Sequence, residues 1–218
     1  MSKKQLHKKQ EITINNLLTP KWKQRTFDTH QVHIKNYAGK SFKVAFMGDS
    51  MMERWLNNDL WKQNFSDYAN LGVGGDGIEH LLFRLTTDIK SYTGDTPKTI
   101  LDVITVERLI LMIGTNNSEK KSAESICEGV ANILNIIFKK QPNIEIVLYG
   151  LTKRKDVPDN KIDQINEGLA TYVNNLKNDK ITYRELDSIG KECLLDQVHL
   201  NNDGYKRWFD DLKIVLKD

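Results

Sequence analysis

The chain has 218 residues, 39% of them hydrophobic, with 32 Lys or Arg against 29 Asp or Glu and a formal net charge of +3. This length and composition suit one folded domain with a substantial core, and no repeat or low-complexity tract argues for more. The apolar runs are strand-length and fall short of the roughly 20 residues of a membrane span, which argues against a spanning protein and favours a soluble one.

The N-terminal segment carries most of the excess positive charge. Residues 1–43 hold ten Lys or Arg and two Asp or Glu, whereas the remainder holds 22 and 27. We expect residues 1–42 to form a basic arm, solvated as charged tails often are, ahead of one domain at 43–218. Contact of the arm with an anionic surface, or anchoring through Trp22 and Phe27, are the alternatives. Because no apolar signal region follows the basic start, we expect a cytoplasmic location.

Strand-like and helix-like segments alternate along the rest of the chain. We predict strands at about 43–47, 68–71, 108–113, 144–150 and 181–186, and helices at about 51–63, 77–90, 122–140, 161–177 and 204–216. This alternation is typical of a parallel sheet with helices on both faces. The predicted fold class is α/β, a three-layer α/β/α sandwich with a five-stranded parallel sheet, flavodoxin-like and with right-handed crossovers.

Four short polar segments follow predicted strands. They are Gly48-Asp49-Ser50, Gly72 to Asp76, Gly114 to Asn117, and Asp196 to His199. Positions of this kind share one edge of a parallel sheet, which is where α/β proteins bind their ligands. We therefore expect the four segments to form one site.

The residues in these segments suit a serine esterase. A hydroxyl such as that of Ser50 needs a base to activate it and a third group to orient that base. His199 is our candidate base, and Asp196 lies three residues away, close enough to accept from its ring. Acyl transfer also needs donors for the developing oxyanion. We assign them to the backbone N–H groups of Ser50 and Gly75 and to the side-chain amide of Asn116.

Each segment also has an interpretation without function. Gly-Asp-Ser is common in turns, a glycine-rich stretch often marks only a bend between strand and helix, and Asn116-Asn117 suits a solvated turn. A lone histidine such as His199 is more often structural than catalytic. The occurrence of all four segments after strands, in one order, favours the esterase interpretation over these separate ones.

These residues resemble the four signature blocks of the SGNH (GDSL) hydrolases, and the resemblance spans roughly residues 43–217. Within the family, Asn70 to Asp76, Gly114 to Asn117 and His199-Leu200 are most similar to the intracellular platelet-activating factor acetylhydrolase branch and to bacterial GDSL esterases. The resemblance implies the flavodoxin-like SGNH hydrolase fold, Ser50 as nucleophile, His199 as base, Asp196 as its partner, and an oxyanion hole completed by Gly75 and Asn116. One departure is Asn117, where many members carry Asp.

The predicted function is hydrolysis of short-chain, acetyl-type oxygen esters through an acyl-serine intermediate. No long apolar insertion is available as a lipase-type lid, and the resemblance extends to carbohydrate esterases. A thioesterase or lysophospholipase, and a catalytically silent binding module, are the alternatives. We expect a small-molecule or carbohydrate ester as substrate, no nucleic-acid partner, and no metal or cofactor. Cys127 and Cys193 have no partners at metal-ligand spacing. The resemblance makes a homodimer a further expectation.

Overall fold

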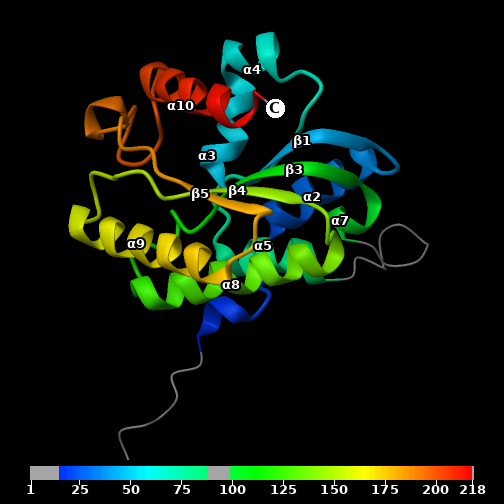
Figure 1. The fold of residues 1–218 in the computed structure, drawn as a ribbon, viewed down its shortest axis with the longest axis horizontal. Coiled ribbons are helices and arrows are strands. Elements are labelled where there is room, and N and C mark those ends of the chain that lie inside the picture. The colour runs from blue at the N-terminus through cyan, green and yellow to red at the C-terminus, as the bar shows by residue number, and fades with distance from the viewer. Residues whose placement is uncertain (1–14, 88–98, 218) are drawn as a thin grey trace, which may run out of the picture.

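The computed structural model describes residues 15–87 and 99–217 and contains one parallel sheet (Figure 1). The strands are β1 (Ser41–Gly48), β2 (Ala69–Gly72), β3 (Thr105–Met112), β4 (Glu145–Tyr149) and β5 (Ile181–Arg184), in the order β2-β1-β3-β4-β5. This is the flavodoxin-like order, in which the sequence of strands reverses beside β1. The register sets Gly48 beside both Gly72 and Met112, so the ends of β2, β1 and β3 are level.

Helices cover both faces of this sheet (Figure 1). On one face lie α3 (Ser50–Glu53), α4 (Asp59–Asn64) and α10 (Asn202–Val215); on the other lie α2 (Gln24–Tyr37), α5 (Ile78–Thr86), α8 (Ala123–Lys140) and α9 (Asp159–Leu176). The short α7 (Ile100–Val103) and the 3-10 turns η1 (Asn16–Leu18), η2 (Arg54–Asn57) and η3 (Lys191–Cys193) complete the elements of the described residues. The predicted three-layer α/β/α sandwich with a five-stranded parallel sheet is confirmed.

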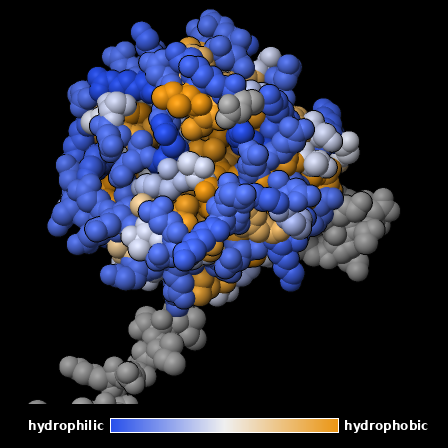
Figure 2. Space-filling model, viewed as in Figure 1, coloured by the Kyte–Doolittle hydropathy of each residue, from blue (hydrophilic) through white to orange (hydrophobic). Residues whose placement is uncertain are grey.

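The core differs in character between the two faces. Under α3 and α10 it is aromatic, with Phe46, Trp55 and Trp208 fully buried and their rings in edge-to-face contact around Trp55. On the opposite face α8 buries an aliphatic stripe whose members recur at spacings of three and four, namely Ile126, Val130, Ile133, Leu134 and Ile137. Strand β1 is continuously apolar and buried from Val44 to Met47, as expected for a strand covered on both sides. The outer surface in the view of Figure 2 is mostly hydrophilic.

The described part of the N-terminal segment is packed on the domain. Leu17 of η1 and Phe27 of α2 are buried, and α2 lies against α5 and α7. The solvated-arm interpretation is therefore wrong for residues 15–42, whereas residues 1–14 lie outside the described residues. Phe27 anchors the segment as the alternative foresaw, but Trp22 stays exposed.

The helix predicted at 51–63 is interrupted. It forms α3, η2 and α4, and Asn58 separates the last two because its side-chain oxygen accepts from the N–H of Leu60 and starts a new helix there. Several predicted boundaries also shift. Strand β3 begins at Thr105 instead of 108, α5 ends at Thr86 instead of 90, with residues 88–90 outside the described residues, and α9 begins at Asp159 instead of 161. No helix of the described residues is long and apolar enough to cross a membrane.

Candidate active site

Ser50 lies at a tight turn, where β1 passes into α3 through Asp49 alone. Gly48 makes this turn feasible, because a Cβ at that position would stand 1.9 Å from the carbonyl oxygen of Met112. Asp49 then caps α3 by accepting from the N–H of Met51 at 2.9 Å. The result places the Ser50 hydroxyl at the carboxyl edge of the sheet, with 8% of the residue exposed.

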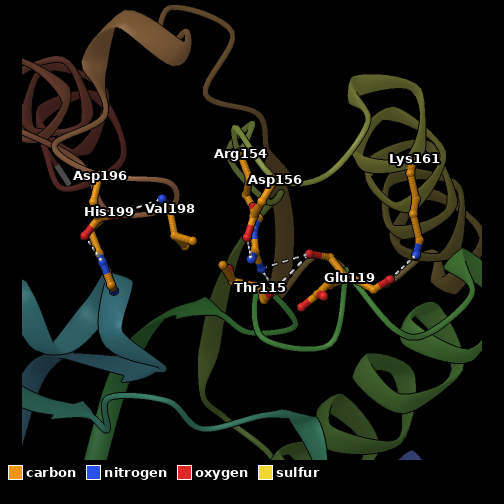
Figure 3. A network of polar contacts seen from close by, with 9 residues as sticks. Thr115, Glu119, Arg154, Asp156, Lys161, Asp196, Val198 and His199 are labelled. Atoms are coloured by element: carbon orange, nitrogen blue, oxygen red, sulfur yellow. Dashed lines mark hydrogen bonds and ion pairs between the residues drawn. The ribbon is translucent and has the colours of Figure 1, made fainter.

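Ser50, His199 and Asp196 form one chain of hydrogen bonds. Nε2 of His199 stands 3.0 Å from Oγ of Ser50, and Nδ1 stands 2.7 Å from Oδ2 of Asp196. Figure 3 shows the imidazole directed from Asp196 toward the start of α3. This is the nucleophile, base and orienting carboxylate arrangement of serine hydrolases.

The Asp196 carboxylate is held ionised by its own loop. Partial burial opposes ionisation, but its oxygen accepts from the backbone N–H groups of His199 and Val198, each at 2.8 Å. These bonds and the contact with the His199 ring outweigh burial and hold the pKa of Asp196 well below its usual range. The loop itself is closed by a bridge between Leu194 and Leu200.

Gly75 and Asn116, two of the three predicted oxyanion donors, lie on loops that touch each other. Gly75 sits on the loop after β2 with φ of +77°, a conformation that glycine tolerates best. Its N–H, like that of Ser50, has no acceptor among the described residues. The Asn116 amide, on the loop after β3, donates to the carbonyl of Asp76 at 2.8 Å. An amide nitrogen carries two hydrogens, so one remains for a ligand.

Asn117 does more than form a turn. It is buried, its Oδ1 accepts from the N–H of Ile78 at 2.9 Å, and its Nδ2 donates to Glu79 at 2.9 Å. The side chain therefore caps the start of α5 from a loop about forty residues away in sequence. Sequence reasoning assigned this residue only to the turn and missed the contact.

Arg84 and Asp76 form a buried ion pair beneath the site, which the sequence analysis also missed. Nε of Arg84 stands 3.0 Å from Oδ2 of Asp76, and both side chains are fully buried. The other guanidinium nitrogens donate to the carbonyls of Leu71 and Gly48, at 2.8 and 3.0 Å. One side chain thus ties the ends of β1 and β2 to the loop that carries Gly75. The available signal was an arginine within the apolar run of α5.

Arg154 holds the loop after β3, as Arg84 holds the loop after β2. Its guanidinium donates to the carbonyl of Thr115 at 2.5 Å and pairs with Asp156 (Figure 3). The next residue, Lys155, donates its backbone N–H to the carbonyl of Gln197 at 2.9 Å. The loop after β4 therefore links the Asn116 loop to the His199 loop.

Three apolar residues that follow Ser50 in the sequence belong to the buried core and do not line an open substrate cleft. Met51, Met52 and Trp55 are fully buried. Within the described ranges, no three His, Cys, Asp or Glu side chains gather as a metal site requires. A cavity of about 780 Å³ lies at the opposite edge of the sheet, lined by residues that include Lys43, Thr105 and Glu145.

No family model matches the chain. It is 27% identical over 196 residues to platelet-activating factor acetylhydrolase IB subunit alpha2 of Rattus norvegicus, covering 84% of this chain and 80% of that protein. It is 28% identical over 192 residues to the IB subunit alpha1 of the same organism, covering 83% of this chain and 78% of that protein.

Solved structures with the same fold carry names from one group of enzymes. A GDSL-like lipase of Bacteroides thetaiotaomicron has a TM-score of 0.63 at 16% identity, covering 88% of this chain and 97% of that one. A carbohydrate esterase family 3 protein of Talaromyces cellulolyticus has a TM-score of 0.59 at 16% identity, covering 81% of this chain and 99% of that one. With the acetylhydrolase relatives, these similarities confirm the resemblance to the SGNH (GDSL) hydrolases that was found in the sequence, and they support an ester-cleaving enzyme.

Proposed function

We propose that this protein hydrolyses short-chain oxygen esters, acetyl esters above all, through an acyl-Ser50 intermediate. The observation that carries the proposal is the continuous hydrogen-bond chain from Ser50 Oγ through the His199 ring to Asp196, at 3.0 and 2.7 Å. Nucleophile and base are already within the distance that proton transfer requires.

The reaction runs in two halves. Oγ of Ser50 attacks the acyl carbonyl while Nε2 of His199 takes the hydroxyl proton, and Asp196 stabilises the imidazolium that forms. The tetrahedral oxyanion accepts from the N–H groups of Ser50 and Gly75 and from the Asn116 amide. Collapse expels the alcohol, to which His199 returns the proton. Water, deprotonated by His199, then attacks the acyl carbonyl, and collapse of this second tetrahedral intermediate releases the acid while His199 returns the proton to Oγ of Ser50.

Three observations support a short acyl group. The sequence relatives are named acetylhydrolases, and one structural neighbour is a carbohydrate esterase. Within the described residues, β1 is joined to α3 by one residue and β2 to α5 by five, Val73 to Gly77. Neither connection supplies an apolar lid for a long chain. We propose an acetylated small molecule or carbohydrate as substrate, with its alcohol portion exposed to solvent.

The test combines substrate length with site variants. We expect p-nitrophenyl acetate to be cleaved faster than longer p-nitrophenyl esters, and a fluorophosphonate to label the wild-type chain. Ser50→Ala and His199→Ala should each fall to near background, and the double variant should be little worse, because groups acting as a unit are not additive. Asp196→Ala should lose less than His199→Ala. Ser188→Ala, an exposed serine, is the matched control.

The alternatives give different results in the same assays. A thioesterase would prefer a matched thioester, and a lysophospholipase would prefer long-chain lysolipid. A silent binding module would be neither labelled nor active. Labelling that persists in Ser50→Ala, or additive losses in the Ser50 and His199 variants, would contradict the proposed mechanism.

A further inference from the structure

The start of α2 lies directly against the loop that carries Gly75. Nζ of Lys23 donates to the carbonyl oxygen of Gly75 at 2.7 Å. Oγ1 of Thr26 donates to Oδ1 of Asp76 at 2.5 Å. These two residues, one helical turn apart, therefore hold two consecutive residues of the loop.

A third contact extends the same surface to Gly74. Arg25 pairs with Glu53 of α3 at 2.9 Å. A Cβ built on Gly74 would stand 2.6 Å from the Glu53 carboxylate and 2.8 Å from the Arg25 guanidinium. The ion pair thus lies close over Gly74 and adds a third contact to the loop.

The loop needs such contacts because its sequence does not fix its shape. Glycine reaches many backbone conformations at similar energy, and Gly74 and Gly75 are adjacent. Within the loop, the N–H of Asp76 bonds to the carbonyl of Val73 at 3.1 Å. An oxyanion donor, by contrast, acts only if it is oriented before the reaction begins.

We propose that the first turn of α2 is a clamp that orients the Gly75 N–H toward the oxyanion, with Lys23 as its principal positioning residue. The inference rests on the proposed function, since it assigns Gly75 to the oxyanion hole. Lys23 touches the peptide that follows Gly75 and acts through it, without contacting substrate. The segment that was expected to be a solvated arm then helps to position an oxyanion donor.

The central variant is Lys23→Met, which keeps the length of the side chain and removes its donor. Complete loss of one oxyanion donor costs about 100- to 1000-fold in kcat, so a donor that is loosened but present should cost about 5- to 50-fold. KM and the melting temperature should hardly change, because the defect appears mainly in the transition state. Lys23→Arg should recover most of the loss.

Two further variants supply a second test of the clamp and a control. Thr26→Val removes the second contact at nearly constant volume and should also lower kcat more than it raises KM. Lys35→Met alters an exposed lysine in the last turn of the same helix and should match wild type. Amide hydrogen exchange supplies a readout that does not depend on turnover: the peptide that contains residues 73–77 should exchange faster in Lys23→Met and at the wild-type rate in Lys35→Met.

The clamp is refuted by unchanged exchange in this peptide, or by a Lys23→Met enzyme whose kcat stays within about twofold of wild type. A rise in KM at constant kcat would refute it too, because it would make Lys23 a contact for an anionic substrate. Failure of the proposed function looks different. In that case Ser50→Ala keeps its activity, while the exchange experiment still decides whether Lys23 holds the loop.

Discussion

Asp49, the neighbour of Ser50, is a carboxyl group that the fold should keep protonated at low and moderate pH. It is 0% exposed, and its Oδ2 has no hydrogen-bond partner among the described residues. Burial raises the pKa of Asp49 from 3.8 to about 7, and the nearby Asp76 carboxylate adds to the rise. Asp49→Asn keeps the oxygen that accepts from Met51 and removes the charge, so it isolates the cost of ionisation.

The sign of the effect follows from proton linkage. Between pH 3.8 and about 7 the folded chain holds a proton on Asp49 that the unfolded chain has released. The stabilisation is therefore fully present below the unfolded pKa and is lost as the pH rises through the folded one. About three pH units at about 1.4 kcal/mol each give roughly 4 kcal/mol. The Asn variant does not titrate at this position and should avoid that loss.

Urea unfolding of both proteins across this pH range measures the difference directly. We expect the stability of wild type relative to Asp49→Asn to fall by roughly 4 kcal/mol between about pH 4 and pH 8. Other titrating groups cancel in the difference because both chains share them. Asp187→Asn, which removes an exposed carboxylate, is the matched control variant. A flat difference curve for Asp49→Asn would refute a buried carboxyl that holds its proton.

Three further predictions concern the surrounding groups. Asn116→Ala should lower kcat on p-nitrophenyl acetate by about 100- to 1000-fold with little change in KM; a variant as active as wild type would remove Asn116 from the oxyanion hole. Arg84→Met should lower the free energy of unfolding in urea by about 3–5 kcal/mol, because Asp76 is left buried and unpaired; a loss of less than about 1 kcal/mol would contradict this. Burial, aided by Arg84, lowers the pKa values of His30 and His33 to about 3. At these two histidines the unfolded chain therefore binds more protons than the folded one from about pH 6.5 down to pH 3, so their contribution makes stability fall as the pH is lowered; a His30→Leu variant with the same pH slope as wild type would contradict it.

The elements that could be predicted from the sequence are those whose apolar pattern reports their burial. The run from Val44 to Met47 and the stripe on α8 are apolar throughout, and both are buried as expected. Helix α2 was missed because two of its inward positions are His30 and His33. A pattern analysis counts histidine as polar, and the basic charge of the segment pointed to a tail.

The candidate site also contains residues that the sequence predicted and residues that it did not. Ser50, His199 and Asp196 are joined by the hydrogen bonds that the motifs led us to expect. The supporting residues Arg84 and Arg154 were missed because several of their partners are backbone carbonyls on other loops. Every residue carries a backbone carbonyl, so the sequence cannot show which carbonyl accepts a hydrogen bond. Only the fold reveals these contacts.

Those supporting contacts explain how a site made of loops can be preorganised. The loops after β2 and β3 are joined to each other through Asn116 on Asp76 and through Asn117 on Ile78. Arg84 fixes the first loop to the sheet. The proposed oxyanion donors Gly75 and Asn116 thus lie on loops that are held in place once the chain has folded, as preorganised donors require. Since Asn117 uses both its amide oxygen and its amide nitrogen to hold the start of α5, its loss should weaken folding and catalysis together, whereas loss of Asn116 should affect catalysis far more than folding.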